Sequence, residues 1–211
     1  MGCGTTKEKP NELEPEQIMV ISKKKKEDKK QNINKDNNTP QYNKEDVLLI
    51  KSKKKPKTKK DKFIQDALEK HNELRAAHGV EPLSISEDLN IIAQKYAEHL
   101  ASIDKIVRSD NTYKGEELGE NIYCCLGKEI EGDLMTTTWY EEINEYNFDN
   151  PGFSSETGHF TQIVWKDTKK VGFGFAQSSS GIYYGVGYYF PVGNINTKND
   201  FINNVLRKKI I

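Results

Sequence analysis

The sequence predicts an α+β domain preceded by a disordered N-terminal tail, and two observations lead to this prediction. Residues 1–62 hold 18 lysines and 10 acidic residues, a net charge of +8; because the whole chain is neutral, residues 63–211 carry −8. Within this acidic part, helical periodicity comes first and strand-like runs come last. Helices followed by antiparallel strands favour α+β layers over a parallel sheet.

The tail, residues 1–62, is rich in Lys, Asn, Glu and Pro and contains one aromatic residue, Tyr42. Such a segment buries too little apolar surface to offset the entropy of ordering it, so we expect disorder. Its longest apolar runs, 18–21 and 47–50, are too short for a membrane span or a secretory signal. With three cysteines in all, we expect no disulfide framework and a reducing compartment.

The first six residues fit an N-myristoylation signal, with Gly2 exposed once Met1 is removed and Thr6 at the sixth position. Cys3 is a natural site for a palmitoyl chain. One myristoyl chain binds membranes only marginally, so stable anchoring needs a second signal. The palmitoyl group and the lysines, which are attracted to an anionic leaflet, both provide one. We therefore predict that acyl chains and the lysine-rich tail bind anionic membrane lipids.

The lysine-rich run 53–60 could also be a nuclear localisation signal or a nucleic-acid-binding patch. The tail has no arginine and no interleaved aromatic residues on which bases could stack. The acidic domain would in addition repel phosphate. We therefore expect no nucleic-acid partner.

Two amphipathic helices are expected at the start of the domain. The first begins at Phe63 and should end at Gly79, and the second has Ser86 as its N-cap. Their apolar stripes are Phe63, Ile64, Ala67, Leu68, His71 and Leu74, and then Leu89, Ile92, Ala93, Tyr96, Ala97 and Leu100. The second stripe is read as plain core.

A third helix is expected over residues 134–146, after Asp133. Runs of β-branched or aromatic residues predict strands at 162–166, 172–176 and 183–190, and residues 178–181 predict a hairpin turn. The aromatic strand should pack one face in the core, and its other face is a candidate surface for a lipid or a second copy.

Two adjacent cysteines, Cys124 and Cys125, allow two interpretations. They could chelate a metal or form a strained disulfide. Free cysteine is among the most often buried residue types, so we favour two small core residues.

Four motifs resemble those of the CAP superfamily (cysteine-rich secretory, antigen 5 and pathogenesis-related proteins), in that family's order. They are His71–Arg75 followed by Pro82 and Leu83, Gly119–Ile122, Gly158–Thr168 and Tyr188–Ile195. The resemblance covers roughly residues 63–206 and implies an α-β-α sandwich (a CAP, or SCP, domain) with a central cleft. Residues 207–211 would form a short C-terminal tail.

Within the superfamily, the chain looks like the branch of Golgi-associated plant pathogenesis-related proteins. The resemblance implies a non-secreted protein acylated at Gly2, on the cytoplasmic face of the Golgi, the plasma membrane or both. It also implies binding to anionic lipids and a possible homodimer.

The resemblance further implies a cleft with two histidines and two glutamates, which can hold a divalent metal. Glu120, Glu142 and His159 match three of these positions. Imidazole nitrogen and carboxylate oxygen both suit zinc. Arg108 stands where the second histidine is expected, and a guanidinium has no lone pair to give to a metal.

We therefore hypothesise that Arg108 replaces the charge of the metal by forming a bidentate ion pair with Glu120 or Glu142. The cleft would then hold no cofactor. The alternative is that Arg108 is an exposed loop residue and that Glu120, Glu142 and His159 still bind zinc weakly.

Catalysis is not expected. The chain contains neither His-Glu-x-x-His nor Gly-x-Ser-x-Gly. Ser154, Ser155 and Thr157 precede His159, but serine-rich segments of this kind are mostly turns. The sequence thus predicts an acylated membrane protein that associates with lipid or acts as a scaffold. The alternatives are a module that recruits a protein partner to membranes and a metal-dependent hydrolase.

Overall fold

The computed structural model describes residues 58–195 and 197–209. The chain divides into two units, Met1–Lys53 and Lys54–Ile211, and all described residues belong to the second. The predicted acylation sites Gly2 and Cys3, and the lysine-rich tail up to residue 57, lie outside the described residues. Within the described part, no helix is both long and apolar enough to cross a membrane.

Helix α2 spans Lys59–Ala77 and begins four residues before the predicted boundary at Phe63. Thr58 forms a capping box with Asp61: its hydroxyl accepts from the Asp61 amide at 3.0 Å, and its own amide donates to the Asp61 carboxylate at 3.1 Å. This pairing satisfies two amides that the helix cannot satisfy itself. The expectation of disorder through residue 62 is therefore wrong for residues 59–62.

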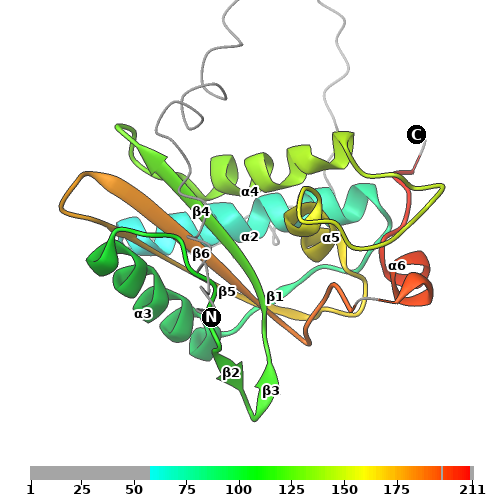
Figure 1. Cartoon of the computed structure of the whole chain (residues 1–211), viewed down its shortest axis with the longest axis horizontal. Coiled ribbons are helices and arrows are strands. Elements are labelled where there is room, and N and C mark those ends of the chain that lie inside the picture. The colour runs from blue at the N-terminus through cyan, green and yellow to red at the C-terminus, as the bar shows by residue number, and fades with distance from the viewer. Residues whose placement is uncertain (1–57, 196, 210–211) are drawn as a thin grey trace, which may run out of the picture. The chain divides into compact units, whose positions relative to one another are not determined.

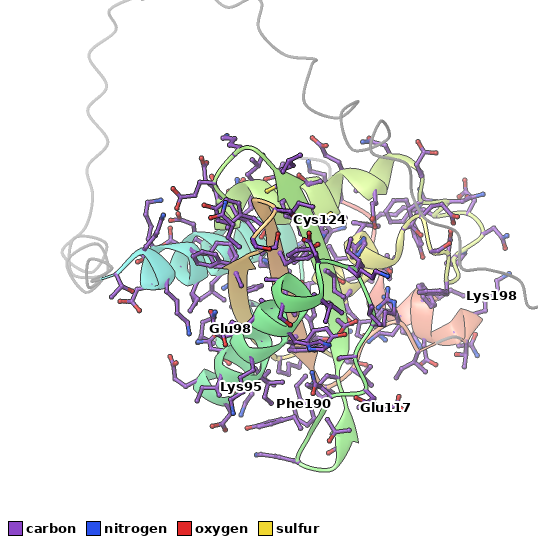
Figure 2. All side chains as sticks on the ribbon, turned by 60° about the vertical axis from the view of Figure 1, so that its left-hand side comes forward. Lys95, Glu98, Glu117, Cys124, Phe190 and Lys198 are labelled. Carbon is purple, nitrogen blue, oxygen red and sulfur yellow. The ribbon has the colours of Figure 1, made fainter. Side chains whose placement is uncertain are left out.

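Helix α3 spans Glu87–Ile103, and Ser86 is its N-cap as predicted. The Ser86 hydroxyl accepts from the Leu89 amide at 3.4 Å. The helix ends at Asp104, which adopts the left-handed conformation with φ 52°. The exposed side of α3 carries Lys95 and Glu98 (Figure 2).

The main sheet has four strands in the order β1-β5-β6-β4. These are β1 (Ser84–Ile85), β4 (Gly119–Leu126), β5 (Lys170–Gln177) and β6 (Ile182–Phe190). The β1–β5 pair is parallel, and the other two pairs are antiparallel. The predicted hairpin joins β5 to β6. A separate two-stranded sheet is formed by β2 (Thr112–Tyr113) and β3 (Glu116–Glu117).

The remaining helices are α4 (Gly132–Tyr140), the 3₁₀ turn η2 (Glu141–Asn144), α5 (Gly158–Val164) and α6 (Lys198–Asn204). Together α4 and η2 account for most of the predicted third helix. The predicted strand at 162–166 is wrong, because residues 158–164 form α5. A short apolar run does not distinguish a buried strand from a buried helix, and Phe160 to Val164 are all buried.

The elements stack as an α-β-α sandwich, as predicted (Figure 1). Alternate residues of β6 face opposite layers: Tyr188 belongs to the apolar cluster under α3, and Tyr189 to the larger cluster under α2, α4 and α5. This alternation follows from the two-residue period of a strand. The aromatic strand is therefore buried on both faces along much of its length, which leaves less of it for a lipid or a second copy than expected.

Candidate functional site

His159 and Glu142 form a close pair at the start of α5. The His159 Nδ1 atom lies 2.5 Å from Oε1 of Glu142. The other carboxylate oxygen accepts the backbone amides of His159 and Phe160 at 2.9 and 3.1 Å. The His159 ring is nearly parallel to that of Trp139, with an interplanar angle of 14°. Glu142 therefore fixes the imidazole through one nitrogen, and among the described residues Nε2 has no hydrogen-bond partner.

Glu120 and Arg108 form the second pair. The Glu120 carboxylate is 6% exposed and accepts the Ser109 amide and the Tyr188 hydroxyl, each at 3.1 Å. The Arg108 guanidinium is largely exposed; its Nη1 lies 3.7 Å from Oε1 of Glu120 and 3.3 Å from the Glu120 carbonyl oxygen. Of the two partners considered from the sequence, the structure places Arg108 next to Glu120.

A single residue connects the two pairs. Asn121 follows Glu120 on β4, and its side-chain amide donates to the His159 carbonyl oxygen at 3.2 Å and to the Tyr189 hydroxyl at 3.1 Å. Glu120 itself contacts Tyr188, which lies on the α3 side of the sheet. Across residues 58–195 and 197–209, no three His, Cys, Asp or Glu side chains group closely enough to hold a metal. Glu120, Glu142 and His159 therefore do not form a ready-made ligand set.

The sequence did not indicate a buried polar chain below this site. His71 is fully buried on α2; its Nε2 lies 2.8 Å from the Tyr189 hydroxyl, and its Nδ1 lies 2.7 Å from the Ala67 carbonyl oxygen. Burial lowers the pKa of His71 to about 3, so the ring is neutral. The available signal was a histidine inside an otherwise apolar helical stripe.

Cys124 and Cys125 are free thiols on β4, and each is partly buried. Cys124 is labelled in Figure 2. Cys124 packs with the α3 cluster and Cys125 with the opposite cluster, because consecutive strand residues face opposite sides. Burial raises the pKa of both thiols, which disfavours the reactive thiolate. The structure thus favours the packing interpretation over a vicinal disulfide or chelate.

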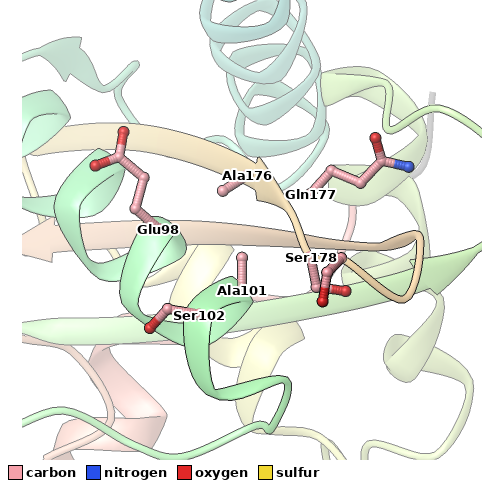
Figure 3. A pocket seen from close by; sticks show the side chains of 7 residues that line it. Glu98, Ala101, Ser102, Ala176, Gln177 and Ser178 are labelled. Carbon is pink, nitrogen blue, oxygen red and sulfur yellow. The ribbon is translucent and has the colours of Figure 1, made fainter.

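Two surface hollows lie away from these residues. One, of about 330 Å³, is lined by polar and small side chains of α3 and the end of β5, including Glu98, Ser102 and Gln177 (Figure 3). The other, of about 480 Å³, lies between α2 and α3, and its apolar lining includes Ile64, Leu68 and Ile85. Neither contains any of the four predicted site residues.

Comparison with known proteins gives consistent matches. Residues 68–190 match the model of the family described as "CAP: Cysteine-rich secretory protein family". The chain is 43% identical over 157 residues to Golgi-associated plant pathogenesis-related protein 1 of Homo sapiens, covering 72% of this chain and 98% of the relative. It is 33% identical over 144 residues to pathogenesis-related protein 1A of Nicotiana tabacum, covering 65% and 80%.

A further relative is longer than this chain's matching part. Protein PRY2 of Saccharomyces cerevisiae is 36% identical over 147 residues, which span 68% of this chain and 41% of the yeast protein. Among solved structures, NaASP2 with Zn²⁺ superimposes with a TM-score of 0.57 at 21% identity, covering 74% of this chain and 89% of the other. At that identity, the structural match establishes the fold alone.

Proposed function

The chain belongs to the cysteine-rich secretory protein (CAP) family, and from that premise we propose that it is an acylated, membrane-associated member that binds lipid or acts as a scaffold without catalysis. We place it on the cytoplasmic face of the Golgi, the plasma membrane or both. The observation that carries the proposal is the 43% identity to a Golgi-associated relative across nearly all of that relative's length.

The charge distribution supports a division of labour between the two parts of the chain. Helix α2 begins at Lys59, so the domain from that residue on carries −6, and anionic lipid should repel it. Residues 1–58 carry +6, and each lysine near an anionic leaflet contributes about 1 kcal/mol of attraction. The acyl groups on Gly2 and Cys3 would add the apolar part of the anchor. The tail is thus the proposed membrane contact.

Among the described residues, His159 and Glu142 do not form a complete catalytic triad. Glu142 orients the imidazole, as the carboxylate of a catalytic triad does, but a triad also needs a nucleophile within hydrogen-bond reach. Among the described residues, no Ser, Thr or Cys side chain is hydrogen-bonded to His159. Ser154 and Ser155 bond instead to the exposed Glu156.

Vesicle flotation of the full chain tests the proposal. The protein would be co-expressed with an N-myristoyltransferase and a protein S-acyltransferase, so that both acyl chains can be attached, and mixed with vesicles that contain phosphatidylserine. We expect Gly2→Ala to lose membrane binding and Cys3→Ser to dissociate faster, because one acyl chain anchors weakly. Gly4→Ala is the matched control and should bind like the wild type, since that position of the signal is variable. Equal binding by Gly2→Ala and wild type would refute acylation as the anchor.

A second function, recruitment of a protein partner or a second copy, is favoured by apolar side chains on the surface. Ile103, the last residue of α3, is 39% exposed, and Ile106 and Val107 in the following loop are 52% and 47% exposed. Grouped exposed apolar residues often mark interaction surfaces. Native mass spectrometry of the full chain distinguishes the two functions: retained lipid supports lipid association, and a lipid-free dimer supports the interaction module.

A further inference from the structure

We propose that Arg108 is the resident cation of the candidate site and that the site operates without the divalent metal that the family resemblance implies. The proposal concerns the site's chemistry and does not depend on membrane anchoring. It rests on the donor set that the structure assembles around Glu120, Glu142 and His159.

The Glu120 side chain is nearly inaccessible to solvent. One oxygen accepts both the Ser109 amide and the Tyr188 hydroxyl at 3.1 Å, and the other faces Arg108 Nη1 at 3.7 Å. A buried carboxylate is costly unless hydrogen-bond donors or a positive charge surround it. Here neutral donors and a guanidinium already fill that need. A metal would have to displace them.

Glu142 and His159 are already hydrogen-bonded to each other. Both Glu142 oxygens accept hydrogen bonds, one from the imidazole and one from two backbone amides. His159 therefore offers a metal only Nε2. One nitrogen falls short of the three or four protein ligands that zinc sites use.

The charge of Arg108 also disfavours a metal ion at Glu120. A divalent ion bonded to Glu120 would sit close to the positively charged guanidinium of Arg108. Two positive groups within a few ångströms repel each other. Arg108 thus disfavours the metal in two ways: it supplies no lone pair, and its charge opposes the ion.

A zinc titration with a matched pair of variants tests the proposal. The full-length wild type, Arg108→His and Arg108→Gln would compete with a fluorescent chelator for Zn²⁺. Both variants remove the guanidinium, but only histidine supplies a ligand nitrogen. We expect Arg108→His to bind zinc at least tenfold more tightly than Arg108→Gln. Adding Glu120→Gln to Arg108→His should abolish the gain, and zinc bound elsewhere cancels because all variants share the other residues.

Two outcomes would overturn the proposal. Equal zinc affinity of Arg108→His and Arg108→Gln would mean that residue 108 does not occupy a ligand position. Stoichiometric zinc on the wild type that His159→Ala removes would mean that the site holds metal despite Arg108. The second comparison remains decisive if Arg108→His does not fold. Wild-type zinc affinity that His159→Ala leaves unchanged would uphold the proposal.

Discussion

The imidazole of His71 on α2 accepts a hydrogen bond from the hydroxyl of Tyr189 on β6, across 2.8 Å. The assignment follows from the other ring nitrogen: Nδ1 faces the Ala67 carbonyl oxygen and must carry the proton. The Tyr189 oxygen in turn accepts from Asn121, whose amide also holds the His159 carbonyl oxygen. A buried chain of polar groups therefore connects the first helix to the backbone of the candidate site.

Tyr189→Phe should reduce the free energy of unfolding by about 1–3 kcal/mol, because it leaves His71 and Asn121 each short of a buried partner. Urea unfolding followed by circular dichroism measures the change. Tyr183→Phe on the same strand is the matched control, since no hydrogen bond of its hydroxyl is found among the described residues and its side chain is only partly buried. Equal losses for the two variants would argue against the network.

The same histidine makes stability depend on pH. Burial lowers the pKa of His71 from 6.5 to about 3, so the folded protein disfavours the protonated form that the unfolded chain adopts. Stability is therefore fully present above pH 6.5 and is lost as the pH falls toward 3, by about 1.4 kcal/mol per pH unit for one proton. Burial lowers the pKa of His78 as well, with the same sign.

Urea unfolding between pH 7 and pH 4 checks this slope. His71→Gln should lower the slope of unfolding free energy against pH by the contribution of one proton, about 1.4 kcal/mol per pH unit. The carboxylates are the same in both proteins, so their contribution cancels in the comparison. His99→Gln, at an exposed position on α3, is the matched control for the removal of a histidine. A wild-type slope in His71→Gln would show that another group carries the effect.

The sequence predicted what is local and periodic. The stripe on α3 and its Ser86 cap appear as expected, because an amphipathic helix repeats its signal over several turns. The helix α5 was mistaken for a strand because its run of apolar residues is short. The Thr58 cap was overlooked because lysines surround it.

Contacts that cross the sheet could not be predicted. His71 and Tyr189 are separated by 118 positions, and neither carries a spacing signal that names the other. The motif resemblance placed Arg108 near two carboxylates, but the path of the loop after α3 selects Glu120. These contacts depend on how complete helices, strands and loops pack together, which no local sequence pattern encodes.

Arg75 is a second long-range contact. It is fully buried on α2, and its guanidinium donates to backbone carbonyls rather than to an acid. The acceptors are Glu81 at 2.8 Å, Ile163 and Trp165 each at 2.8 Å, and Thr168 at 3.0 Å. Burial lowers its pKa to about 10, so the side chain stays charged at neutral pH. The Arg75 side chain thus links α2 to the backbone at the end of α5 and in the segment before β5.

Arg75→Lys should destabilise the fold by about 3 kcal/mol or more, because one ammonium cannot satisfy four separated carbonyls and leaves buried acceptors unpaired. Guanidinium chloride unfolding measures the loss. Arg207→Lys, at an exposed arginine that contacts Asp149, is the control and should change stability by less than about 1 kcal/mol. A mild effect of Arg75→Lys would mean that water replaces the lost donors.

Helix α3 packs closely against β5 at Gly174. A methyl group at Gly174 would lie 2.3 Å from the Gln94 amide nitrogen and 2.4 Å from its Cα, both backbone atoms that cannot turn aside. Gly174→Ala should therefore push the helix away from the sheet and cost about 1–3 kcal/mol or more, visible as a lower melting temperature. Gly152→Ala has open space around the added methyl and should melt within a few degrees of the wild type. If the two variants melt alike, α3 can shift on the sheet without loss, and the contacts of Asn90 and Gln94 with β5 do not hold it in place.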